Sequence, residues 1–476
     1  MLPLRSQSNY YELIERCNLV FWGKCPKNAI MGTLEGLNMI LRFGCSNFKS
    51  ISDYQELLMT ATNIKEIEQH NVFHPDGIRE GVLPITAIYG ANGAGKTNIL
   101  SALAFFVNSI RLNTKRDFSD VSIPKFKLDT EFENIDTGFD IDFYLNGKHY
   151  HYGYLVKEGI VQSEWLYLFS YKKRMSRTVL FHRDAEADEE YYFSKEFKGK
   201  NVAISEITSS STLFLSTAAK SNHDTAREVF EYFDDCYNFR FRNGNNENSI
   251  AKKILENDLK KDIGNFLSLI DIGAVSLDVK KHKLEDEQKE LKAGLRQAFI
   301  SLLNTNESIE FKLGDNDESV EYNLSISRKN SEGAIVNFKY GDESLGTRSL
   351  ISLLASVFLI LRNGGVFIVD ELESSLHTLL SLKVVELFNC SKINSKGAQL
   401  IFTTHETQLL SYSGFRKDEI WLTEKCGNGS TKLAPLSDYA IPNKSNVRNG
   451  YLDGRFGAIP FLGLIDSFEN LWGSNG

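Results

Sequence analysis

A glycine-rich stretch near residue 90 has the residue types and spacing of a phosphate-binding loop. Residues 90–97 read Gly-Ala-Asn-Gly-Ala-Gly-Lys-Thr and fit the pattern G-x-x-x-x-G-K-[ST]. An apolar β-type segment, 83–89, precedes the loop, and a helical pattern, 98–107, follows it. Glycines let backbone N–H groups turn toward a phosphate with no Cβ in the way. The stretch therefore predicts a nucleoside triphosphate site rather than a plain glycine turn.

Each part of this loop has an expected role. Lys96 would reach the β- and γ-phosphates, and the hydroxyl of Thr97 would be a ligand of Mg²⁺. The expected cofactors are therefore ATP and Mg²⁺. The residues expected to bind the nucleotide are Gly90, Asn92, Gly93, Ala94, Gly95, Lys96, Thr97 and Asn98.

A second candidate for chemistry lies far downstream, at the end of a short apolar run. Residues 364–371 read Gly-Gly-Val-Phe-Ile-Val-Asp-Glu, which is typical of a buried parallel strand. Open α/β sheets bind ligands at the carboxyl ends of such strands. Asp370 is expected to support Mg²⁺, and Glu371 to orient and deprotonate the attacking water. Taken alone, the run fits an ordinary core strand equally well.

Two further segments could contact the γ-phosphate. Ser344 and Gly346 open the apolar helix predicted at 351–361, and a helix N-terminus presents free N–H groups to an anion. A plain helix cap is the alternative. The β-type run 400–405 ends in His405, whose ring could hydrogen-bond a phosphate. A lone histidine after a strand is more often a cap or a surface group.

The order of these motifs resembles that of the ABC-type ATPases. In that family the Ser-x-Gly helix of one copy completes the site of another, so the resemblance implies this role for Ser344 and Gly346. It also implies that residues 373–377 form the D-loop and that His405 is a switch histidine in catalysis, beside Lys96 and Glu371. The signature reads Glu-Ser-Leu-Gly-Thr instead of Leu-Ser-Gly-Gly-Gln. This departure argues against a transporter ATPase.

More closely, the chain resembles the bacterial ATPases related to SMC, RecF and OLD proteins, and the AAA-type, ABC-like subunits of abortive-infection and restriction-linked loci. The resemblance implies an ATP-driven homodimer or higher homo-oligomer that acts as sensor or gate for a separate toxic effector, commonly a nuclease, in anti-phage defence. A RecF-like clamp on duplex DNA is the rival; it would need a basic face near the dimer seam. The stretches that carry the resemblance are 40–50, 89–97, 342–348, 366–377, 396–399, 403–407 and 451–460.

The composition limits the class of protein. The 476 residues are 42% hydrophobic and 24% charged, as in ordinary globular chains. The net charge of −8 does not indicate nucleic-acid binding by the whole molecule, although a basic groove on one face stays open. Six cysteines without a Cys-x-x-Cys pair favour reduced thiols in the cytoplasm. No apolar run reaches the roughly 18 residues that span a bilayer, so no membrane partner is expected.

The two halves of the predicted site lie far apart in the sequence, so a large insertion must split one nucleotide-binding core. We expect an α/β fold: an ABC-type P-loop NTPase head with a mixed sheet, an antiparallel β-subdomain and a helical insertion. The expected division is an N-terminal extension outside the resemblance at 1–38, a lobe with the phosphate loop at 39–124, the β-subdomain at 125–214, the helical insertion at 215–305, and a lobe with the signature helix, Asp-Glu strand, D-loop and switch histidine at 306–476.

Alternation at 139–145 and 149–156, around Asn-Gly-Lys, predicts a β-hairpin. Its tyrosines, at 150, 152 and 154, could stack on bases, but strand-core packing is the stronger expectation. Basic clusters at 172–174, 240–242 and 280–283 are expected to be solvated faces more often than nucleic-acid contacts. Since 476 − 405 = 71 residues follow His405, too few for a Toprim nuclease domain, a nuclease would be a separate polypeptide.

Overall fold

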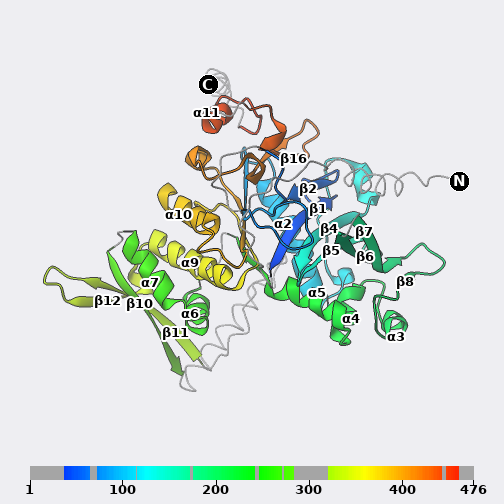
Figure 1. Cartoon of the computed structure of the whole chain (residues 1–476), viewed down its shortest axis with the longest axis horizontal. Coiled ribbons are helices and arrows are strands. Elements are labelled where there is room, and N and C mark those ends of the chain that lie inside the picture. The colour runs from blue at the N-terminus through cyan, green and yellow to red at the C-terminus, as the bar shows by residue number, and fades with distance from the viewer. Residues whose placement is uncertain are drawn as a thin grey trace, which may run out of the picture.

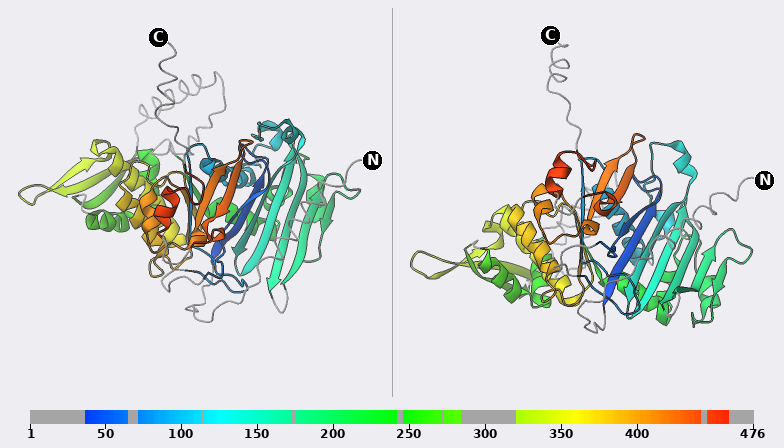
Figure 2. Two further views of the ribbon diagram at one scale, coloured as in Figure 1. Left: turned by 90° about the horizontal axis from the view of Figure 1, so that it is seen from above. Right: turned by 45° about the horizontal axis from the view of Figure 1, so that its top comes forward.

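Three β-sheets organise the described part of the chain (Figure 1). The computed structural model describes residues 37–64, 72–113, 115–171, 175–241, 246–270, 273–283, 320–441 and 446–459. One sheet has seven strands, one has six and one has three. Figure 2 shows the largest and the smallest sheet at opposite ends of the molecule, with the other sheet between them. The predicted N-terminal extension (residues 1–36 of it), the basic cluster at 172–174 and Arg242 lie outside the described residues.

The six-stranded sheet positions the predicted site. Its strand order is β16-β15-β3-β14-β13-β9, and all neighbours pair in parallel except β15 and β16. Strands that are buried on both faces consist of nearly continuous apolar residues. This explains why the sequence indicates the strands at 85–90, 366–369 and 399–403. The expected mixed sheet is confirmed. Its strands are β16 (Thr431–Pro435), β15 (Ile420–Lys425), β3 (Ile85–Gly90), β14 (Gln399–Thr403), β13 (Val366–Val369) and β9 (Tyr237–Arg240).

Helices cover both faces of this sheet. On one face α2 (Lys96–Leu112) packs Ile99 and Leu103 against the strands and joins the core shared with the antiparallel sheet. On the other face lie α9 (Leu345–Asn363) and α10 (Thr378–Asn389), which pack Val357 and Val384 against Phe367. A further described helix, α11 (Val447–Leu452), follows β16 in the sequence.

The antiparallel sheet has seven strands in the order β2-β1-β4-β5-β6-β7-β8. The predicted hairpin is present: Leu145 pairs with Lys148 across a turn in which both Asn146 and Gly147 have positive φ. The strands are β1 (Asn38–Ser46), β2 (Gln55–Leu58), β4 (Thr137–Leu145), β5 (Lys148–Lys157), β6 (Ile160–Tyr171), β7 (Met175–Asp184) and β8 (Tyr191–Phe193).

The three tyrosines of β5 are core residues. Tyr150, Tyr152 and Tyr154 are at most 1% exposed, and Phe106 of α2 stacks on the ring of Tyr154. A base-stacking platform needs exposed rings. These tyrosines therefore provide packing, as expected, and no nucleic-acid surface.

Of the helical insertion expected at 215–305, residues 284–305 lie outside the described residues. The described part holds helices and also two strands that were not expected, β9 and β10. β10 forms a three-stranded sheet with β11 and β12, and α6 and α7 cover one face of it. Only Leu277 and Val279 alternate clearly inside β10, so the strand signal was short. Apart from β9, the helices and strands described between residues 201 and 339 are α3 (Asn201–Glu206), α4 (Phe214–Lys220), α5 (Asp224–Asp235), α6 (Glu247–Glu256), α7 (Lys260–Leu269), β10 (Ala274–Lys283), β11 (Val320–Lys329) and β12 (Ile335–Lys339).

One helix of the described part of the chain, α9, is long and apolar enough to cross a membrane by length and composition alone. Of its apolar window, 61% is buried inside the fold. Packing on β13 and on α6 and α7 explains this apolar character. Short 3₁₀ helices occur at Phe118–Asp120, Thr130–Asn134, Tyr340–Asp342, Thr407–Ser411, Lys417–Glu419 and Leu436–Asp438.

Candidate nucleotide site

The phosphate loop connects β3 to α2 with the geometry that its glycines predict. Gly93 and Gly95 have φ of 76° and 100°, in the left-handed region that glycine tolerates. A Cβ on Gly95 would also lie 2.0 Å from Oγ1 of Thr431. No side chain caps the N-terminus of α2. Its first N–H groups are therefore open to an anion, which the helix dipole also favours.

Hydrogen bonds from hydroxyl groups outside the motif help to hold this loop in place. Thr431 Oγ1 donates to the carbonyl of Ala94 over 3.0 Å and lies 2.7 Å from Oγ of Ser50. Asn98, expected to contact the nucleotide, donates its amide to Ser50 Oγ over 2.7 Å. Asn92 is exposed at the loop tip. Ser50 closes one of the stretches that carry the resemblance, whereas nothing in the sequence marked Thr431.

Lys96 lies across the base of the loop. Its Nζ donates to the carbonyls of Gly90 over 2.8 Å and Ala91 over 3.0 Å, and the residue is 6% exposed. Burial lowers the pKa of Lys96 to about 8, although the carboxylates of Glu371, Asp370 and Glu373 oppose the shift. An ammonium has three donors, so one donor remains for a phosphate.

The structure brings together the two residues predicted to bind the metal. Thr97 Oγ1 donates to Oδ1 of Asp370 over 2.9 Å, across 273 positions of sequence. A hydroxyl and a carboxylate are the hard oxygen ligands that Mg²⁺ prefers. The pair therefore fits the expected metal.

A residue that the sequence analysis did not single out connects this carboxylate to Glu371. Thr403, the last residue of β14, donates from Oγ1 to Asp370 Oδ1 over 2.7 Å. The same Oγ1 accepts the backbone N–H of Glu371 over 2.8 Å. Glu371 has φ of 53°, a left-handed conformation that costs a non-glycine residue on the order of 1–3 kcal/mol.

His405 and the expected D-loop lie beside this junction. The backbone N–H of His405 donates to Oε1 of Glu373 over 2.7 Å, and the side chain of His405 is exposed. In the D-loop, Ser375 has a left-handed φ of 64°. His377 is the N-cap of α10, and its Nδ1 accepts the N–H of Leu379 over 3.2 Å. Capping gives His377 a structural role.

The signature pair lies at an exposed helix start. Ser344 caps α9, and its Oγ accepts the N–H of Thr347 over 3.1 Å. A Cβ on Gly346 would lie 3.1 Å from the carbonyl oxygen of Ser375, so the start of α9 abuts the D-loop. Within the described part of the chain, no hydrogen bond or ion pair joins Ser344 or Gly346 to the phosphate loop. The structure brings Lys96, Thr97, Asp370 and Glu371 together, whereas no such contact joins Ser344 or Gly346 to them among the described residues.

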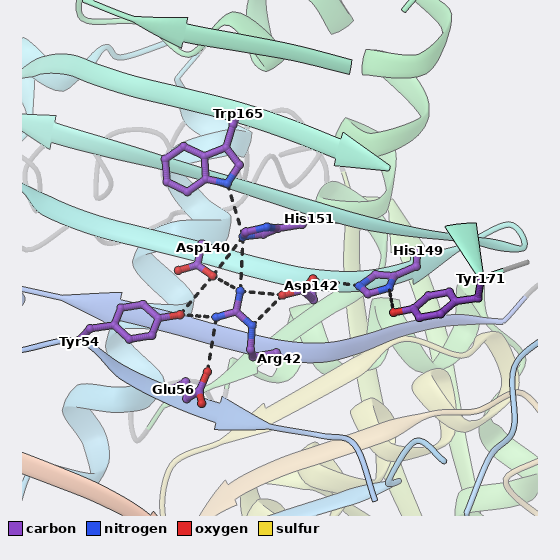
Figure 3. Close-up of polar contacts among 9 residues, drawn as sticks. All are labelled: Arg42, Tyr54, Glu56, Asp140, Asp142, His149, His151, Trp165 and Tyr171. Carbon is purple, nitrogen blue, oxygen red and sulfur yellow. Dashed lines mark hydrogen bonds and ion pairs between the residues drawn. The ribbon is translucent and has the colours of Figure 1, made fainter. Parts of the chain in front are cut away.

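A second polar cluster, the Arg42 cluster, lies in the antiparallel sheet (Figure 3). Its centre is the guanidinium of Arg42, which pairs with Asp140 and, from Nε over 2.7 Å, with Asp142. His151 lies 3.3 Å from Asp140. The oxygens and nitrogen of these three partners lie within 4.8 Å of one another, as metal ligands do. Figure 3 shows the guanidinium between the two carboxylates, so Arg42 already supplies the positive charge.

Charge pairing keeps both carboxylates of the Arg42 cluster ionised. Burial opposes ionisation, but the guanidinium of Arg42 and the ring of His151 lower the pKa of Asp140 below its usual value. The pKa of Asp142 is lowered in the same way, with His149 as a further partner at 2.9 Å. The other members of the cluster are Tyr54, Glu56, Trp165 and Tyr171. This cluster is a buried ion-pair network apart from the nucleotide site.

Comparison with known proteins gives one family and a set of solved structures. Residues 85–411 match the family described as "AAA domain, putative AbiEii toxin, Type IV TA system". An SMC head domain from Thermotoga maritima is 14% identical, with 83% of this chain and 98% of that chain covered and a TM-score of 0.37. An Smc head domain with an extended coiled coil bound to the C-terminal domain of ScpA, derived from Pyrococcus furiosus, is also 14% identical, with 84% and 98% covered and a TM-score of 0.37. The curated proteins contain no match.

Proposed function

Since the chain belongs to this AAA domain family, we propose that it is an ATP-hydrolysing, ABC-type switch whose two copies close around ATP. The observation that carries the proposal is the junction of Thr97 with Asp370, 2.9 Å apart, beside the loop that Lys96 spans. The pair joins the start of α2 to the end of β13, which lie 273 positions apart in the sequence.

The proposed mechanism assigns a task to each residue. The N–H groups at the start of α2 and the ammonium of Lys96 bind the β- and γ-phosphates. Thr97 and Asp370 would hold Mg²⁺, which neutralises phosphate charge when bound. Glu371 accepts a proton from the attacking water, and His405 hydrogen-bonds the γ-phosphate.

The site is completed by a second copy. Among the residues that the structure describes, no hydrogen bond or ion pair joins Ser344 or Gly346 to the phosphate loop, and the start of α9 is exposed. We place this helix end against the γ-phosphate bound by the partner, where its N–H groups stabilise the anion. Hydrolysis is then slow in isolated copies, because part of the donors to the transition state comes from the partner.

The biological setting that we propose is anti-phage defence in the cytoplasm. The family description names a type IV toxin–antitoxin system, and the resemblance to abortive-infection subunits points the same way. The switch would sense infection or gate a separate toxic effector, with a nuclease as the expected class.

Mass photometry of Glu371→Gln tests closure. With Mg-ATP this variant is expected to populate a species of at least twice the chain mass, because it binds ATP without consuming it. ADP lacks the γ-phosphate and EDTA removes the Mg²⁺, so the species should disappear under either condition. Adding Ser344→Asp to the same chain keeps the helix cap but brings a carboxylate to the phosphate, and should also remove it.

The same measurement separates the proposal from the DNA-clamp alternative. Co-expression with the product of the neighbouring gene is expected to yield an ATP-stabilised complex that contains this product. A protein that ignores its neighbour but binds duplex DNA in a salt-sensitive way would support the clamp instead. A mass that does not change with Mg-ATP would contradict both.

A further inference from the structure

We propose that Thr403 is a positioning residue that couples the metal-binding carboxylate of Asp370 to the backbone of Glu371. The inference rests on the proposed function and deepens it, because it concerns how this chain prepares its own Mg²⁺ and water sites. Thr403 itself is not expected to touch ATP or the metal.

One hydroxyl makes both connections. Thr403 Oγ1 donates to Asp370 Oδ1 over 2.7 Å and accepts the N–H of Glu371 over 2.8 Å. A hydroxyl has one proton and two lone pairs, so it can donate and accept at the same time. The backbone continues the link, because the N–H of Leu372 donates to the carbonyl of Thr403 over 3.1 Å. The end of β14 thus holds the end of β13 by side chain and backbone.

Because Thr403 is buried, water cannot easily take over the hydrogen bonds of its hydroxyl group. Thr403 is 0% exposed, and Asp370 is 9% exposed. Without the hydroxyl, the N–H of Glu371 would lose this hydrogen bond in a partly buried place, and an unpaired donor there costs free energy. The left-handed conformation of Glu371 would then lose one of the contacts that hold it.

The carboxylate of Asp370 is held from two sides. Thr97 approaches Oδ1 at 2.9 Å and Oδ2 at 3.2 Å, and Thr403 approaches Oδ1 from the neighbouring strand. When Thr97 turns to a metal, Thr403 is the contact that keeps the carboxylate in place. Groups that orient metal ligands in this way typically contribute about 10–100-fold in metal affinity or activity.

The test compares Thr403→Val, which keeps the shape and removes the hydroxyl, with Thr403→Ser, which keeps the hydroxyl. Binding of a fluorescent ATP analogue is measured in EDTA and in a Mg²⁺ titration, followed by ATP turnover. In EDTA both variants should bind like wild type, because the loop and Lys96 are untouched. Thr403→Val should need about 10-fold more Mg²⁺ for half-maximal binding and lose about 10–100-fold in kcat. Thr403→Ser should stay within a few-fold of wild type.

Thr86→Val is the matched control. Thr86 is a fully buried threonine of the adjacent strand β3, and its hydroxyl contacts Met59 instead of the site. It should keep the wild-type Mg²⁺ dependence. Analogue binding in EDTA reports folding of each variant, and Thr403→Ala replaces Thr403→Val if the latter does not fold.

The outcomes separate the two proposals. Wild-type Mg²⁺ dependence and kcat in Thr403→Val would overturn the positioning role alone, as would an equal loss in Thr403→Ser. A wild-type protein that binds no nucleotide would instead remove the proposed function, and this inference with it.

Discussion

Replacing Glu371 by glutamine is expected to lower kcat for ATP hydrolysis about 10²–10⁴-fold and to leave ATP binding within a few-fold of wild type. An amide has the shape of a carboxylate but cannot take a proton from water. The contact with Thr403 uses the backbone N–H of Glu371, so the substitution leaves it in place. Steady-state phosphate release and equilibrium ATP binding measure the two quantities.

The control is the same substitution away from the site. Glu386 lies on α10 and pairs with Lys383 over 2.6 Å at the surface. Glu386→Gln should keep the wild-type kcat. If Glu371→Gln hydrolyses ATP at the wild-type rate, another group activates the water and the assignment of the base is wrong.

Removing the charge of Arg42 is expected to cost about 3–5 kcal/mol of the free energy of unfolding at pH 7. Arg42→Met keeps much of the side-chain volume, but it leaves Asp140 and Asp142 buried without their cation. Both carboxylates lie against the sheet, at 4% and 14% side-chain exposure, so water compensates little. Urea unfolding followed by circular dichroism measures the loss.

The pH dependence of this loss has a definite sign. In the wild type, the pKa values of Asp140 and Asp142 are lowered by folding. Their contribution is therefore complete above the unfolded-state pKa of about 4 and is lost as the pH falls through the folded-state values. Without Arg42, burial favours the neutral acids, so the difference between variant and wild type should shrink from pH 7 toward pH 4.

An exposed ion pair provides the comparison for Arg42. Arg455 pairs with Asp453 at 69% and 54% side-chain exposure. Arg455→Met should change the free energy of unfolding by less than about 1 kcal/mol, because solvent screens such pairs. A loss below that value for Arg42→Met as well would show that the Arg42 cluster is not a stabilising network.

Local sequence patterns were enough to predict those parts of the site that are formed by one continuous segment of the chain. The phosphate loop is one continuous segment whose glycines have a backbone reason, and the strand before Asp370 is an uninterrupted apolar run. The hairpin at 145–148 is likewise a local turn. In each case neighbours in sequence are neighbours in space, so residue types alone indicate the structure.

Contacts between distant segments were not predictable in this way. Thr403 is one of two adjacent threonines, and only the register of β13 with β14 places its hydroxyl beside Asp370. Thr431 reaches the phosphate loop because β16 pairs with β15, which itself pairs with β3. β9 has four residues and gains its partner, β13, from more than a hundred positions away. The catalytic roles and the domain boundaries stay predictions.

The most direct test of the central claim is to mix two inactive variants that are defective in different halves of the site. Lys96→Ala removes the phosphate contact, and Ser344→Asp keeps the cap of α9 while opposing the γ-phosphate. In a symmetric dimer whose sites each combine both halves, a mixed dimer has one intact site. An equal mixture should therefore recover about a quarter of the wild-type ATP turnover. Turnover no higher than the mean of the two variants alone would contradict a site shared between copies.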